Sequence, residues 1–548
     1  MQILKSVYFF FLSNKNNFFN SLKKIYFSTN FYNKSLFTKI PKQFYFYPRP
    51  NLLFSFNREM NFHFKLSKLN TNEFWQEQKT ERDDKIVNSF EWLYLINRKN
   101  DVLIIQRLIS LWIYKNKKYK KKTWENSLIS KRVISWILNA DIILNNTNTT
   151  FKNSFFQSII SQTNHLKKNF SLNVRIVDKF KSTIVIILTG LVFKEYENNY
   201  ENGIKDLKKL VDSFFDEDGF PFSRNSSDLA EISKYLVLIR EAIKDAQKYV
   251  PDYLENILEK NINNLNHLLS PTNQLPLFNG TKETNLEKYI KYLKNFNYKI
   301  EKTDKFVGCI RVLKSKKNYL YFDVGPPPKK NFFETYQAGP LSFEYYFEKE
   351  KIITNCGFGS NISKKATLLS RLSSAHSTLT INDTSIVKFH NLNFLNGVSS
   401  PIIKNRFKIS ENTIFEDDTY FKAKASHNAY EKEFGCFHKR EISINKNNYT
   451  LSGIDEIVKS NNDKKVKFNI YFHLFPGVNA VRTMGGDNIL IQIKKNKSLV
   501  FSAKGEKLLL EKSLFFGGNK ILNNFCISIF GEFSDQSRLV KWEIKRES

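Results

Sequence analysis

The feature that most constrains this chain is a change of pattern near Tyr298. Before it, apolar residues recur with the period of an amphipathic helix, as Leu207, Leu210, Val211 and Phe214 do. After it, short alternating runs rich in Val, Ile, Phe and Tyr are separated by Gly, Asn and Asp, which is typical of strands. The chain is therefore predicted to join a helical half to a β half.

The helical half predicts several helices of similar length joined by short turns. We expect helices at 155–172, 177–193, 203–215 and 251–269. Another should follow the turn DEDGFP (216–221) and begin after SRNSSD (223–228), with Ser226, Ser227 or Asp228 capping its first N–H groups. Such a series favours stacked antiparallel hairpins, as in an (α/α) toroid.

The β half carries strand-like runs from 307 to 530, dense enough to predict a large antiparallel β-sandwich. We place three domains on the chain: an N-terminal extension packed on the body at 1–84, the (α/α) toroid at 85–297, and the β-sandwich at 298–548.

Charge and composition limit the classes of partner. The 548 residues carry a formal net charge of +32, which suits a polyanion, although scattered lysines also fit a general compositional bias. No nucleic-acid-binding motif is present, so no nucleic-acid partner is expected. The four cysteines form no CxxC pair. The longest apolar run, 183–193, is too short to cross a bilayer, so no integral membrane span is expected.

Several short motifs occur together in one order. They are DEDGFPFSRN (216–225), AGPLSFE (338–344), IITNCG (352–357), AHSTLTIND (375–383) and ASHNAYEKEFGCFHKR (425–440). In this order and spacing the chain resembles the heparinase II/III-like proteins, polysaccharide lyases with an α-toroid followed by a β-sandwich. The stretch Tyr319–Asp383 holds much of this resemblance, and we expect the active site where the two halves meet.

The resemblance implies cleavage of an acidic, uronate-containing polysaccharide by β-elimination. A cation neutralises the carboxylate, a base takes the neighbouring proton, and an acid protonates the leaving oxygen. The resemblance also implies a cell-envelope or periplasmic location. The N-terminus MQILKSVYFFFLSNKNN is not a clear signal peptide, so a cytoplasmic location stays open, as does the oligomeric state.

Several positions depart from the family pattern. The position of a toroid Tyr reads Asp228, and two sandwich His positions read Thr335 and Gln337. The Asp position of the family's zinc site reads Asn355, which leaves His376 as the one matching ligand. Neutral amide oxygens are poor zinc ligands, so zinc is disfavoured and no metal or other cofactor is expected.

The candidate site is built from the remaining polar residues. We predict catalytic roles for His376, His427, Tyr430 and His438, and substrate-binding roles for Arg224, Asn225, Gln337 and Arg440. Tyr430 would protonate the leaving oxygen, and His427 or His438 would act as the base. Arg224 or Arg440 would neutralise a carboxylate. We expect Arg224, His376, His427 and Tyr430 to converge on one cleft between the two halves.

Two alternatives stay open. The histidines and arginines of 425–440 could instead satisfy backbone groups at strand ends. If the substituted positions have abolished catalysis, the protein would be a glycan-binding or cell-envelope protein on the same fold.

Overall fold

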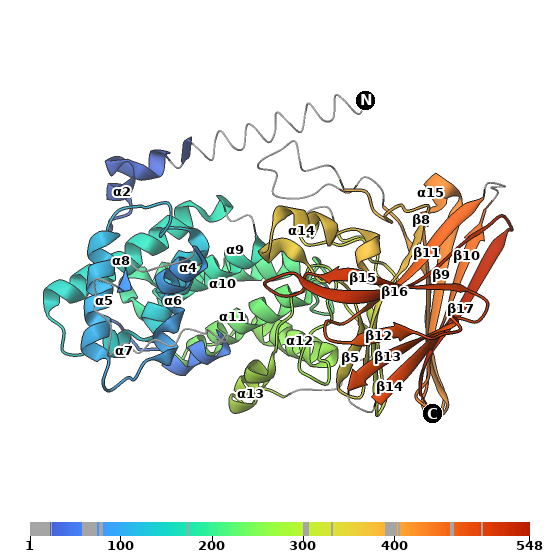
Figure 1. Ribbon diagram of the computed structural model, residues 1–548. Coiled ribbons are helices and arrows are strands. Elements are labelled where there is room, and N and C mark those ends of the chain that lie inside the picture. Colours follow the sequence, from blue (N-terminus) through green and yellow to red (C-terminus); the bar gives the residue numbers. More distant parts are fainter. Residues whose placement is uncertain are drawn as a thin grey trace.

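The structure of the chain is a computed structural model. It describes residues 22–23, 25–56, 74–75, 81–172, 175–299, 306–329, 332–389, 403, 406–460, 465–494 and 497–547. A helical half, blue to green in Figure 1, is followed by a half made of strands, yellow to red. The predicted fold class, helices followed by antiparallel sheets, is confirmed.

The helices of the first half overlap each predicted segment, and further helices lie outside those segments. They are α2 (Asn30–Ser35), α4 (Glu81–Ser89), α5 (Val102–Lys115), α6 (Asn126–Leu138), α7 (Ala140–Ile143), α8 (Thr149–Lys168), α9 (Ile176–Val192), α10 (Glu197–Phe214), α11 (Ser226–Asp245), α12 (Asp252–Leu268) and α13 (Glu287–Asn295). Helix α9 packs against α6, α8, α10 and α11, which makes it the centre of this half. The apolar stripe of α10 is buried as its period requires.

The N-terminus of α11 differs from the prediction. Asn225, and not one of the three residues after it, is the N-cap, and its side chain accepts a hydrogen bond from the N–H of Ser227 at 2.8 Å. An Asn at this position satisfies one of the N–H groups that a helix start leaves free. Asp228 is thereby left in the first turn of the helix, with its carboxylate available for other contacts.

The second half consists of strands and short helices. The strands are β1 (Phe306–Val307), β2 (Ile310–Lys314), β3 (Asn318–Asp323), β4 (Phe343–Phe347), β5 (Glu350–Thr354), β6 (Leu379–Ile381), β7 (Ile409–Glu416), β8 (Tyr420–Tyr430), β9 (Cys436–Asn445), β10 (Leu451–Lys459), β11 (Val466–Leu474), β12 (Asn479–Arg482), β13 (Asn488–Lys494), β14 (Lys497–Ser502), β15 (Lys507–Phe515), β16 (Leu522–Phe533) and β17 (Ser537–Arg546). Helices α14 (Lys364–Leu369) and α15 (Glu431–Phe434) lie between strands.

The strands form two antiparallel sheets. Within the described residues, one has the order β1-β2-β3-β4-β5-β11-β16-β15, with β6 pairing to β11. The other has the order β12-β13-β14-β17-β10-β9-β8-β7. Residues of β9 and β10 alternate between buried and half-buried, so one face of this sheet points inward. The inward faces share one apolar core that runs from Leu313 to Ile544.

The two halves meet between α13, which ends at Asn295, and β1, which begins at Phe306. The described part of the N-terminal segment contacts the helical body: Tyr32 Oη lies 2.7 Å from His165 Nδ1 on α8, and the Tyr45 N–H donates to Val192 O on α9. Among the helices that the structure describes, none is long and apolar enough to cross a membrane.

Candidate functional site

A cleft of 450 Å³ lies where the helical half meets the sandwich half. Its helical wall comes from α9, α10, α11 and the turn that precedes α11. Its other wall comes from the long connection between β3 and β4, of which we call the described residues 326–329 and 332–336 the wall loop. The residues that line the cleft are Ile176, Lys179, Ser213, Phe222, Ser223, Asp228, Lys329, Phe332, Glu334 and Thr335.

The charged residues of this lining are balanced. Each wall contributes one lysine and one carboxylate: Lys179 and Asp228 from the helical wall, and Lys329 and Glu334 from the wall loop. The large positive charge of the chain is therefore not concentrated in the cleft. A lysine on each wall could still pair with one anionic group placed between the walls.

Aromatic rings give the cleft an apolar surface. The rings of Phe222 and Phe332 come from opposite walls, with centroids 5.9 Å apart. The Lys329 ammonium lies 4.1 Å from the centroid of the Phe222 ring, a cation–π contact that holds this lysine at the cleft. Rings of this kind offer flat apolar faces to a ligand that also carries polar groups.

The carboxyl group of Asp228 has an altered acidity. Burial raises its pKa to about 6, against the opposing effect of the Arg175 charge, and Ser223 Oγ donates to Oδ2 at 3.1 Å. Burial also raises the pKa of Glu334, again against Arg175. A carboxyl group that titrates near neutral pH in a cleft is suited to accept and return a proton.

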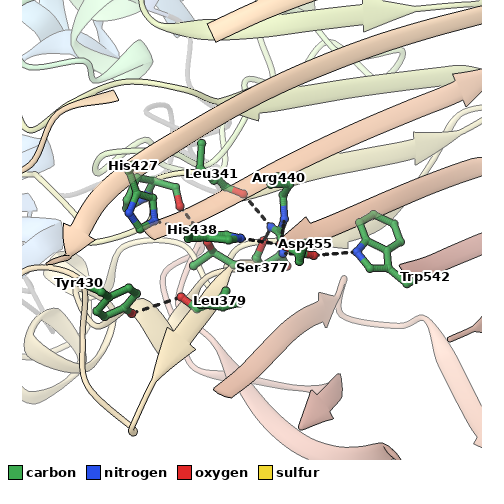
Figure 2. Close-up of polar contacts among 11 residues, drawn as sticks. Leu341, Ser377, Leu379, His427, Tyr430, His438, Arg440, Asp455 and Trp542 are labelled. Carbon is green, nitrogen blue, oxygen red and sulfur yellow. Dashed lines mark hydrogen bonds and ion pairs between the residues drawn. The ribbon is translucent and has the colours of Figure 1, made fainter. Parts of the chain in front are cut away.

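Three of the predicted residues, His427, His438 and Arg440, lie elsewhere, in the interior of the sandwich (Figure 2). We call His427, His438, Arg440, Asp455 and Trp542 the histidine network. His438 lies between His427 Nε2, at 3.3 Å, and Asp455 Oδ1, at 2.6 Å. Arg440 Nε donates to Asp455 Oδ1 at 2.7 Å, and Trp542 Nε1 donates to Oδ2 at 2.9 Å.

The histidine network connects the two sheets. Arg440 on β9 donates from Nη1 to Leu341 O at 2.7 Å and to Ser377 O at 2.8 Å, both beside strands of the other sheet. Burial alone would raise the pKa of Asp455, but Arg440 and His438 lower it below its usual range. His427, His438 and Arg440 are 0% exposed. Their side chains contact protein groups and none lines the cleft, which favours the structural alternative, and their catalytic and substrate-binding roles stay predictions.

Tyr430 and His376 are also enclosed. Tyr430 is 2% exposed and donates from Oη to Thr384 O at 3.0 Å, so its hydroxyl serves the backbone. His376 is 1% exposed beside Gly339, and burial, with a further contribution from His473, lowers its pKa to about 3. Neither is placed to exchange a proton with a bound glycan in this structure.

The predicted substrate-binding residues near the cleft contact protein groups instead. Arg224 forms an ion pair with Asp323 and donates to Pro326 O at 2.8 Å. Asn225 caps α11. Gln337 accepts from the Gly280 N–H at 2.8 Å and donates to Gly357 O and Ser370 O at 2.9 and 2.6 Å. None of these three residues lines the cleft, and their role in substrate contact stays a prediction.

Two of the residues at the family's zinc positions are engaged by protein groups. The amide of Gln337 is fully engaged, and Asn355 Oδ1 accepts the Ser377 N–H at 3.0 Å. Across the described residues, no group of three or more His, Cys, Asp or Glu side chains is arranged to hold a metal.

Sequence reasoning missed the two lysines and Glu334. Lys179 and Lys329 carry no signal of their own among 85 scattered Lys and Arg residues. Asp228 and Thr335, which line the cleft, could have been found, because they occupy positions at which the family motif is changed.

Comparisons with known proteins agree with this architecture. Residues 307–543 match the family model described as heparinase II/III-like, C-terminal. Sequence comparison with curated proteins finds no match.

Among solved structures, heparan sulfate lyase HepC from Pedobacter heparinus has a TM-score of 0.63 at 13% identity, covering 91% of this chain and 86% of that one. A heparinase III has a TM-score of 0.60 at 12% identity, covering 85% and 76%. At such identities the likeness shows the fold. Residues 307–543 thus match the heparinase II/III-like C-terminal domain, and the whole chain shares its fold with solved heparinase III and heparan sulfate lyase structures.

Proposed function

We propose that this protein binds an acidic polysaccharide in the cleft and cleaves it by β-elimination. The observation that carries the proposal is one cleft, formed by both halves, whose lining includes a lysine from each wall, two phenylalanine rings from opposite walls and a carboxyl group of raised pKa. The fold, shared with polysaccharide lyases, supports a substrate of this class.

The residues of the cleft can be assigned to the steps of this reaction. Lys179 or Lys329 would neutralise the uronate carboxylate, which acidifies the C–H at C5. Asp228 would accept that proton as the C5–C4 double bond forms and the C4–O bond breaks. Glu334, from the opposite wall, would return a proton to the leaving oxygen. Each step uses a group that lines the cleft.

A second function, glycan binding without cleavage, is favoured by a specific feature of the lining. All ten lining residues are described, and neither a His nor a Tyr is among them. An Asp is a weaker base than the Tyr or His that the resemblance implies. A base of low pKa is less able to remove the proton from C5. The cleft could therefore bind the glycan without cleaving it.

One experiment distinguishes the two functions. Purified protein is incubated with heparan sulfate, chondroitin and polygalacturonate while ultraviolet absorbance follows the unsaturated product, and binding is measured in parallel by calorimetry. Cleavage supports the lyase, and binding without new absorbance supports the second function.

A charge-matched control locates the ligand. Lys179→Ala and Lys329→Ala should each weaken binding, whereas Lys117→Ala, which removes an exposed lysine outside the cleft, should not. Equal affinities in all three variants would contradict binding in this cleft, whichever function is correct.

A further inference from the structure

The wall loop is held mainly through its backbone carbonyl groups. No strand lies among its described residues, yet it supplies Lys329, Phe332, Glu334 and Thr335 to the cleft. We propose that three arginines from distant segments, Arg224, Arg371 and Arg406, are positioning residues that fix this wall in its ligand-binding geometry. The inference rests on the proposed function, because it concerns the same cleft.

Arg371 holds the C-terminal part of the wall loop. It follows α14 and is 4% exposed. Its Nη1 donates to Phe333 O at 3.2 Å and to Tyr336 O at 2.8 Å, and its Nη2 donates to Glu334 O. The guanidinium also lies over the ring of Phe358, 5.2 Å from its centroid. One side chain thus fixes the backbone on both sides of the two cleft residues Glu334 and Thr335.

Arg406 holds the N-terminal part of the loop. Its Nη2 donates to Pro327 O at 3.1 Å and to Pro328 O at 2.9 Å. Proline has no N–H, so its carbonyl is the one backbone group through which such a residue can be hydrogen-bonded. These contacts lie directly before Lys329, and they set where its side chain enters the cleft.

Arg224 links the wall loop to the opposite wall. It lies in the turn that also carries Phe222 and Ser223, and its Nη1 donates to Pro326 O at 2.8 Å. Its backbone has a φ of 59°, a conformation that non-glycine residues seldom adopt. Gly325 has no side chain, and a Cβ there would overlap the Arg224 guanidinium. The two walls are therefore joined by a contact that requires both residues.

The guanidinium group is the feature that makes this arrangement possible. It is planar and presents five N–H donors, so one arginine can reach two or three carbonyls at fixed angles. A lysine keeps the charge but concentrates its donors on one atom, and it would leave some of these carbonyls without a partner. We therefore expect Arg→Lys changes to release the loop.

The test compares Arg371→Lys and Arg224→Lys with Arg132→Lys. Arg132 is a matched control, since it is 0% exposed and donates to the carbonyls of Asn88 and Thr123, but it does not contact the cleft. Affinity for a polygalacturonate oligosaccharide is measured by calorimetry, hydrogen exchange is measured over 329–337, and thermal unfolding is followed in parallel.

For Arg371→Lys and Arg224→Lys we expect the affinity for the oligosaccharide to fall about tenfold, which equals about 1.4 kcal/mol of binding free energy. Hydrogen exchange over 329–337 should become faster. Arg132→Lys should lower the unfolding temperature but leave the affinity and the hydrogen exchange over 329–337 unchanged. Equal affinity loss in all three variants would overturn the inference, because the effect would then be one of general stability.

A second variant keeps every arginine. Gly325→Ala should displace the Arg224 guanidinium and reproduce the effects of Arg224→Lys. If an Arg→Lys variant does not fold, Gly325→Ala provides the test in its place. If the wild-type protein binds no probe, the proposed function fails, but the exchange comparison still applies. Unchanged exchange over 329–337 in Arg371→Lys and in Gly325→Ala would overturn the inference by itself.

Discussion

The histidine network and the cleft are both built from charged side chains, but they lie in opposite environments. In the histidine network, Arg440 and His438 both contact Asp455, and all three residues are 0% exposed. In the cleft, Asp228 lies beside open space with one hydrogen bond from Ser223. The negative charge of Asp455 is thus neutralised by two cationic partners, whereas the charge of Asp228 is only partly neutralised.

The pKa values of the two aspartates express this difference. Arg440 and His438 lower the pKa of Asp455, so its ionised form stabilises the folded protein. Burial raises the pKa of Asp228 to about 6, so its ionised form disfavours the folded protein. A charge that reduces stability and persists in a cleft is a reasonable mark of function. This criterion selects Asp228 as the group to test for the proton transfer of the proposed function.

The largest effect is expected from Asp455→Ala. It would leave Arg440 and His438 in the interior without their shared partner, and breaking a buried pair in this way costs about 3–5 kcal/mol. Urea unfolding at pH 7 measures the change. Arg538→Ala, which breaks a pair with Glu506 near the surface, should change stability by less than about 1 kcal/mol. Similar losses in the two variants would remove the contrast on which the comparison rests.

The second largest effect is expected from Asp228→Asn, which should raise the stability of the protein and not lower it. The folded pKa of Asp228, about 6, lies above its ordinary value of 3.8, so the folded state holds the proton more tightly. The stability gained from this proton is present at low pH and is lost as pH rises through about 6. Asp228→Asn should therefore stabilise the protein at pH 7 by on the order of 2 kcal/mol, and should not do so at pH 4.

Chemical unfolding of Asp228→Asn at the two pH values is the measurement. Asp212→Asn is the control, because Asp212 is exposed on α10. No stabilisation by Asp228→Asn at pH 7 would show that the carboxyl group is not strained in the cleft.

The fold was largely predictable from the sequence, but the site was not. Apolar residues recur about every 3.6 residues along a half-buried helix and every 2 residues along a half-buried strand. The positions of helices and strands could therefore be predicted. The choice between a catalytic and a structural His427 depends on whether the strand face that carries it is covered by the other sheet. No local pattern encodes that packing. Lys329 presents the converse case, since a loop lysine becomes a site residue through the groups that hold the loop.

A smaller effect is expected in the pH dependence of stability. The folded pKa of His376, about 3, lies below its ordinary value of 6.5, so the unfolded chain binds the proton first. Stability is then lost as pH falls below about 6.5, by about 2 kcal/mol at pH 5 for this group. His376→Asn should reduce the loss between pH 7 and pH 5 by that amount, as measured by unfolding at each pH. An unchanged slope would show that His376 is not kept neutral in the fold.

The most direct test of the central claim, that the ligand site is the cleft and not the histidine network, is one affinity measurement on two variants. The dissociation constant for polygalacturonate is determined by calorimetry for Lys329→Ala and for His427→Gln, each confirmed to be folded. We predict that Lys329→Ala weakens binding about tenfold, through the loss of a charged contact. We predict that His427→Gln binds as the wild type does. Loss of binding in His427→Gln, with full affinity in Lys329→Ala, would contradict the account.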